Sequence, residues 1–194
     1  MLRRHARGVS LVELMIGLTI SGMLLVAGIP AFTAWIQNAH NRTAAESIAN
    51  GLQLARAEAV KRNALVRFQL TDGSGLVTWN VGCVTPSADC PASIQRRHAG
   101  EGATNARAGV SAARLPNPVP AGYFNTPIDG GSGLTAGVTF NGMGRPLVSE
   151  ITRLDVTNAA SSTARRYVVT ISEGGQIRMC DPALDFSTNP QGCS

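Results

Sequence analysis

The chain has 194 residues, only 5% aromatic residues and a formal charge of +5. Three arginines lie in the first eight positions, so the rest of the chain carries 14 basic against 12 acidic residues and is nearly neutral. This balance argues against a strongly basic nucleic-acid-binding protein. About 130 residues follow the first long helix, which is enough for one domain with a core built chiefly from Val, Leu, Ile and Ala.

An uncharged apolar run from 14 to 36 follows the basic amino terminus. A helix of about 20 residues crosses the hydrocarbon layer of a bilayer, so this run predicts a membrane-spanning helix. Arginines before the span keep the amino terminus in the cytoplasm, and everything after Ile36 is expected on the far side. A cleaved signal peptide is the alternative, for which Val26-Ala27-Gly28 offers only a weak site, and the helical pattern continues well beyond it.

Gly8 followed by Val9-Ser10-Leu11-Val12-Glu13 resembles the class III leader of type IV pilins and type II secretion pseudopilins. The resemblance implies that a prepilin peptidase cuts after Gly8 and methylates Val9, although Phe or Met is the usual first mature residue. It also implies that Glu13 meets the amino terminus of a neighbouring subunit during assembly, which supplies the partner that a carboxylate in a membrane needs. Pro30 stands where helices of this family are commonly kinked, because proline removes a backbone hydrogen bond.

Three further segments, 52–63, 139–145 and 175–180, resemble the GspH, FimT and FimU branch of this family. The resemblance implies an α+β type IV pilin fold, in which a long amino-terminal helix packs on an antiparallel β-sheet. The expected parts are a leader (1–8), a transmembrane and assembly segment of the helix (9–36), and a periplasmic globular domain (37–194) that includes the second half of the helix.

Helical spacing of small and aliphatic residues predicts that the helix continues to about Asn63, with Glu58 paired to Arg62 one turn later. Beyond it the pattern alternates with a period of two, which predicts strands arranged as an antiparallel meander on the helix. The stretch 90–137 is rich in Gly, Ala, Pro and Ser, and we expect mainly loop with room for one or two edge strands. The expected strands are 66–70, 77–81, 138–141, 154–157, 167–172 and 176–180, with turns at 71–75 and 173–175.

Four cysteines, Cys83, Cys90, Cys180 and Cys193, allow three disulfide pairings in an oxidising compartment. The turn-forming residues between them favour Cys83 with Cys90 and Cys180 with Cys193. Zinc is the rival use of these residues, but no C-x-x-C spacing occurs. We therefore predict no metal and no cofactor.

No nucleophile elbow, zinc-protease helix, P-loop or dinucleotide fingerprint occurs in the sequence, so we expect a non-enzymatic protein. The resemblance implies a minor pilin that helps to initiate assembly of a type IV pilus and forms part of its tip. Its partners would be other minor and major pilins, the prepilin peptidase, the inner-membrane assembly platform and, before assembly, the inner membrane itself. A type II secretion pseudopilin shares the leader and the fold, and stays an open alternative.

A DNA-binding minor pilin for natural transformation is a further alternative, because clustered arginines can neutralise phosphates. Candidate residues are Arg96 with Arg97 and Arg165 with Arg166. DNA-binding FimT proteins resemble one another in a Gly-Arg-x-Arg element near the carboxyl end. Here that place reads Gly175-Gln176-Ile177-Arg178 and keeps only Arg178, so DNA is not the favoured partner.

Overall fold

The computed structural model describes residues 10–193. It divides into two compact units, Met1–Ile36 and Gln37–Ser194, and a single helix, α1 (Leu11–Arg62), contributes to both. The helix ends as the sequence predicts, because Asn63 adopts a left-handed conformation with φ of 48°. The N–H groups of Asn63 and Ala64 donate to the carbonyls of Val60 and Ala59, as in a Schellman motif.

Two five-stranded sheets make up the rest of the second unit. Neighbouring strands are antiparallel throughout the first sheet, whereas the second contains one parallel pair, β9 with β10. In spatial order the first sheet consists of β3 (Gln95–Arg97), β2 (Trp79–Cys83), β1 (Val66–Leu70), β5 (Gly137–Phe140) and β6 (Pro146–Ser149). The second consists of β10 (Gly192–Cys193), β9 (Ile177–Asp185), β8 (Tyr167–Ile171), β7 (Arg153–Asn158) and β4 (Ala106–Ser111).

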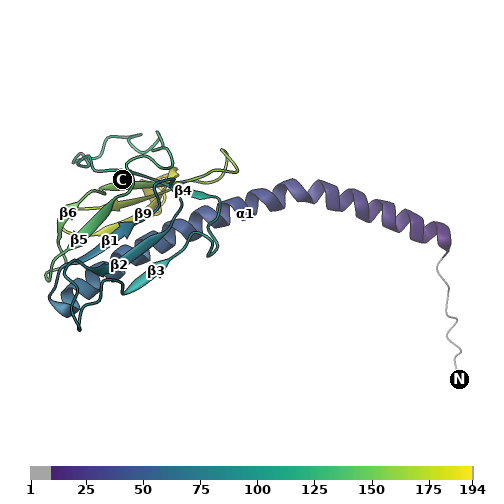
Figure 1. The fold of residues 1–194 in the computed structure, drawn as a ribbon. Helices are drawn as coiled ribbons and strands as arrows, with labels where there is room; N and C mark the ends of the chain where they lie inside the picture. The colour runs from purple at the N-terminus through teal and green to yellow at the C-terminus, as the bar shows by residue number, and fades with distance from the viewer. Residues whose placement is uncertain (1–9, 194) are drawn as a thin grey trace, which may run out of the picture. The chain divides into compact units, whose positions relative to one another are not determined.

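The α+β fold is confirmed, but the prediction of one meander is wrong, because the strands form two sheets (Figure 1). The stretch 90–137 supplies the two edge strands for which it had room, β3 in the first sheet and β4 in the second. Strand β4 lies between β3 and β5 in the sequence but pairs in the second sheet, so the strands of the first sheet are not consecutive along the chain. The return strand of that hairpin begins at Trp79 rather than Val77, and β6 and β10 are strands that the sequence did not predict.

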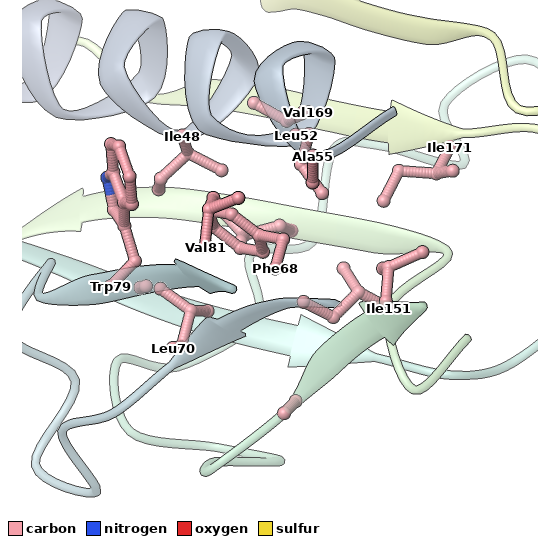
Figure 2. Close-up of a cluster of buried hydrophobic side chains, with 14 of the residues drawn as sticks. Ile48, Leu52, Ala55, Phe68, Leu70, Trp79, Val81, Ile151, Val169 and Ile171 are labelled. Carbon is pink, nitrogen blue, oxygen red and sulfur yellow. The ribbon is translucent and has the colours of Figure 1, made fainter. Parts of the chain in front are cut away.

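One face of α1 packs into a core to which both sheets contribute (Figure 2). Figure 2 shows Ile48, Leu52 and Ala55 pointing from the helix toward the strands. Burying an aliphatic or aromatic side chain of this size stabilises a fold by about 1.5 to 3 kcal/mol relative to leaving it exposed. The largest fully buried side chains are Phe68, Phe140, Ile48, Leu52, Leu70, Ile151, Leu154, Val66, Val77, Val81, Val138 and Val156.

The turn between β1 and β2 is closed by the carboxylate of Asp72. It accepts the hydroxyl of Ser74 at 2.5 Å and the backbone N–H groups of Ser74 and Leu76 at 2.9 and 3.2 Å. The hydrogen bond from the Ser74 hydroxyl is the main reason why the pKa of Asp72 lies below its ordinary value. Because the folded-state pKa of Asp72 is lowered, this turn stabilises the domain at pH values above the usual pKa range of aspartate. That contribution is lost as the pH falls through the lowered pKa of Asp72.

Gly51 lets α1 approach the aromatic pair of the first sheet. A Cβ at this position would lie 2.8 Å from Cε2 of Phe68 and 3.1 Å from Cζ2 of Trp79. Alanine favours a helix by about 0.5 to 1 kcal/mol over glycine, but overpacking a core costs about 1 to 3 kcal/mol. We therefore expect Gly51→Ala to lower the free energy of unfolding by about 1 kcal/mol, measured by urea unfolding of the detergent-solubilised chain.

The matched control is Gly22→Ala on the same helix, where no described atom lies within 4 Å of the added carbon. This control carries the same helix gain without a clash, so it should leave the free energy of unfolding unchanged or raise it by up to about 1 kcal/mol. A Gly51→Ala chain as stable as the control would contradict the tight contact with the aromatic pair.

Candidate functional site

The predicted processing site, Gly8 and Val9, lies outside the described residues. The description begins at Ser10, whose carbonyl accepts the N–H of Leu14 at 3.1 Å and so starts α1. Glu13 lies in the first turn of the helix and is exposed. The amino end of a helix carries partial positive charge from its free N–H groups, so a carboxylate is favoured there. The structure thus places Glu13 at the amino end of the apolar helix, two residues after the start of α1.

The amino-terminal part of α1 exposes apolar side chains around its whole circumference. Each large apolar residue from Leu11 to Trp35 that the structure describes is more than half exposed. An 18-residue window of α1 has a mean hydropathy of 2.0, and α1 is the one helix within residues 10–193 that is long and apolar enough to cross a membrane. A soluble protein does not normally leave a continuous apolar surface of this kind uncovered. This surface is therefore suited to contact with lipid or with other apolar helices.

Polar groups within the apolar stretch are satisfied inside the helix. The hydroxyl groups of Thr19 and Thr33 donate to the carbonyls of Ile16 and Pro30 at 2.8 and 2.9 Å. Pro30 lies inside continuous helix, and the kink implied at this residue stays a prediction. At the end of the stretch, Phe32 and Trp35 stack with ring centroids 6.0 Å apart. Aromatic side chains are enriched where membrane-spanning helices reach the interface.

A group of side-chain amides, which we call the amide cluster, joins α1 to the loops and strands around it where the globular unit begins. Asn41 is fully buried and donates to the carbonyl of Arg165 at 2.9 Å, while Asn158 donates to the side-chain oxygen of Asn41 at 3.0 Å. Asn105 binds Gln37 at 2.9 Å in the same way. A buried amide such as that of Asn41 is costly unless it is bonded, and here half-buried amides on neighbouring segments complete the hydrogen bonds. The cluster fixes the first turns of the helix within this unit to the second sheet.

Two disulfides close short loops, and they are the pairs that the sequence favours. Cys83, the last residue of β2, bonds Cys90 with Cα atoms 5.7 Å apart. Cys180 bonds Cys193 with Cα atoms 5.0 Å apart and holds β10 beside β9. Within the described residues no cysteine is free and no group of three or more acidic, histidine or cysteine residues could hold a metal.

The candidate DNA-binding arginines are divided between the two sheets. Arg96 is exposed on the edge strand β3, and its neighbour Arg97 donates to the carbonyl of Glu101 at 2.6 Å. Arg165 pairs with Asp181, which is buried. Arg178 donates to the carbonyl of Gly192 at 2.9 Å. Internal acceptors hold most of these guanidinium groups, so the structure does not gather them into one basic surface.

Arg166, the remaining candidate, belongs to a buried charged cluster that the sequence does not predict. Its guanidinium pairs with Asp155, which Arg153 also binds at 2.8 and 2.9 Å. Both side chains of the Arg153–Asp155 pair are buried, with exposed fractions of 8% and 0%. Arg153 further donates to the carbonyls of Tyr123 and Thr126 at 3.2 and 2.6 Å. The cluster therefore fastens the loop before β5 onto the second sheet.

Comparison with known families gives two matches that together span most of the chain. A family model described as type II transport protein GspH matches residues 44–175. A model described as the prokaryotic N-terminal methylation motif matches residues 3–29, which include the predicted processing site and Glu13. A search of curated proteins found no match.

Among solved structures, the minor pseudopilin EpsH of the type 2 secretion system of Vibrio cholerae is similar with a TM-score of 0.50 and 12% identity. The alignment covers 75% of this chain and 99% of EpsH. The type IV minor pilin FimU of Pseudomonas aeruginosa gives TM-scores of 0.46 and 0.44 in two crystal forms, at 22% identity. These alignments cover 79% of this chain and 95% and 99% of FimU. At such identities the likeness to EpsH concerns the fold alone.

Proposed function

The chain belongs to the GspH family, and from that premise we propose that it is a minor pilin that helps to initiate assembly of a type IV pilus and forms part of its tip. The observation that supports this most is the uncovered apolar surface of α1 with Glu13 at its amino end. Glu13 is followed by an uncharged apolar run from 14 to 36. A helix of this kind suits first a bilayer and then a bundle of similar helices. The proposed role is structural and not enzymatic.

In the proposed sequence of events, the apolar helix first holds the chain in the inner membrane, with the globular unit in the periplasm. The prepilin peptidase then removes residues 1–8 and leaves a charged, methylated amino group on Val9. Movement into the filament transfers the apolar side chains from lipid to the helices of neighbouring pilins, which costs little because both surroundings are apolar. The negative charge of Glu13 would have no opposite charge beside it after such a transfer. The amino group of the adjacent subunit is the proposed partner for this charge.

The second candidate is a minor pseudopilin of a type II secretion system, which the description of the matching family favours. The two functions predict different losses when the gene is deleted. Loss of surface pili seen by electron microscopy, with normal secretion of exoproteins, would support the pilus function. Loss of exoprotein secretion with intact pili would support the pseudopilin function and overturn the first proposal.

DNA binding is the weaker alternative. Of the candidate arginines, Arg165 and Arg166 neutralise buried carboxylates, and Arg97 bonds the backbone of its own domain. A DNA phosphate would have to replace these internal acceptors before it could bind the arginines. Only then would counterions be released from the DNA and add to the affinity.

Processing supplies a direct test of the membrane steps. We expect the mature chain, extracted from membranes and from sheared filaments, to begin at Val9 and to carry one added methyl group on its amino nitrogen. Intact-mass and amino-terminal peptide mass spectrometry measure both features. A chain that begins at Ile29 would instead show signal-peptide cleavage and remove the helix on which the proposal rests.

A further inference from the structure

The four outer edges of the two sheets differ in how they are protected. An edge strand offers unpaired backbone N–H and C=O groups to any extended chain, so proteins usually cover such edges or give them charged residues. The edge at β3 carries Gln95, Arg96 and Arg97, of which two are charged. The edge at β4 is covered by loops, since Ala108 donates to Gly75 at 2.7 Å and Val110 donates to Ser132 at 2.9 Å.

The remaining edge of the second sheet ends in β10, which has two residues and is fixed to β9 by the Cys180–Cys193 disulfide. The fourth edge, at β6, is different. Its sequence is Pro146-Leu147-Val148-Ser149, with no charge, and Leu147 and Val148 are 58% and 54% exposed. Figure 1 shows β6 lying beyond β5 at the end of the first sheet. Among the described strands, β6 thus forms the apolar open edge.

The register of β6 shows which of its backbone groups face outward. The N–H of Glu150 donates to the carbonyl of Gly137 at 3.0 Å, and Val148 lies opposite Thr139. Successive residues of a strand direct their N–H and C=O groups to opposite sides, so those of Ser149 point away from β5. Leu147 is the extra residue of a β-bulge, a feature that re-aims a side chain.

A groove runs along this open edge, and its lining includes the apolar residues Pro146 and Leu147 as well as the charged residues Arg145 and Glu173. Its first part, of about 270 Å³, lies between β6 and the turn that joins β8 to β9, with Thr152 and Ile171 among its lining residues. A second part, of about 550 Å³, shares these residues and continues past Leu115 and Pro116.

We propose that this groove receives an extended segment of a neighbouring pilin subunit, which adds a strand beside β6. This inference rests on the proposed function, because a filament supplies such a neighbour. The outward N–H and C=O of Ser149 select an extended backbone, which no helix can satisfy in this way. The apolar side chains of Leu147 and Leu115 in this lining select apolar side chains at alternate positions of that segment.

The test compares Ser149→Pro with Ser149→Ala in the full-length chain, expressed in cells that assemble filaments. Both variants lose the hydrogen bond from the Ser149 hydroxyl to the carbonyl of Ile151, and only proline removes the outward N–H. We expect Ser149→Ala to enter sheared filaments at the wild-type level and Ser149→Pro to enter about fivefold less. Equal incorporation of the two variants would overturn the inference while leaving the proposed function intact.

A second measurement separates loss of docking from loss of folding. Leu147 is replaced by the photo-crosslinker p-benzoyl-phenylalanine, which conserves an apolar side chain at an exposed position and leaves Ser149 untouched. Irradiated filaments should contain a crosslink from position 147 to another pilin, and peptide mapping should place it in an extended segment. Crosslinks only to a helix of the neighbour, or none in filaments that contain the variant, would contradict the added strand. Absence of even the wild-type chain from filaments would instead refute the proposed function.

Discussion

Asp155→Asn should be the most destabilising single substitution within the charged cluster, and we expect it to lower the free energy of unfolding by about 3 to 5 kcal/mol. The substitution keeps the size of the side chain and removes the negative charge that Arg153 and Arg166 share. Two guanidinium groups would then remain largely buried with carbonyl oxygens as their main acceptors. Asp155 also accepts the N–H of Ile128 at 3.1 Å, so the loop before β5 should loosen as well.

Thermal unfolding of the detergent-solubilised chain measures this effect, with an expected fall in Tm of roughly 6 to 20 °C. The control is Glu173→Gln, which breaks the ion pair with Arg114 at 2.8 Å, whose side chains are 81% and 72% exposed. Exposed pairs contribute about 0 to 1 kcal/mol, so the control should barely change the Tm. Similar Tm shifts in the two variants would mean that burial does not determine how much the charged cluster contributes to the free energy of unfolding.

Glu13→Ala should leave cleavage and folding of the globular unit intact while it reduces incorporation into filaments tenfold or more. Glu13 belongs to the unit Met1–Ile36, so its removal takes no contact from the packed domain. A hydrogen bond to a charged group contributes about 1.5 to 3 kcal/mol, and each 1.4 kcal/mol changes an equilibrium about tenfold. Quantitative immunoblots of sheared filaments, normalised to the membrane pool, measure the loss.

Glu46→Ala is the matched control, because it removes the same residue type from the same helix. Glu46 pairs with Arg42 one turn away on an exposed face, a contact of about 0.3 to 0.5 kcal/mol. This variant should enter filaments at nearly the wild-type level. Wild-type incorporation of Glu13→Ala would remove the assembly role proposed for this carboxylate.

Local sequence patterns predict the long helix, the strand β1 and the two short disulfide loops of this fold. The period of α1 and its Asn63 end, and the alternation of β1, follow directly from the residues present. The turn residues between the cysteines likewise favour the two disulfides that the structure contains. In each case the interacting groups are near one another in the chain, so the pattern carries the information.

The features that the sequence does not predict depend on contacts between distant segments. Strand β4 reads Ala-Arg-Ala-Gly-Val-Ser, whose small residues give little strand signal, and it is held by pairing with β7. Along β7, Arg153 and Asp155 alternate with Leu154 and Val156, the pattern of a strand with one solvated face. Here the loop before β5 covers that face, so both sides are buried. The local pattern of β7 does not show that a loop from a distant part of the sequence covers its polar face.

The spacing of the two disulfides has a consequence for the export that we propose. Only six residues separate Cys83 from Cys90, and twelve separate Cys180 from Cys193. In a chain that crosses the membrane from its anchored end onward, Cys83 meets its partner long before Cys180 has emerged. Oxidation can therefore follow the order of translocation, and each thiol finds the correct partner as the next cysteine to arrive. Under this order of export, Cys83 and Cys90 would be paired before Cys180 emerges, so a long-range mispairing would find no free partner.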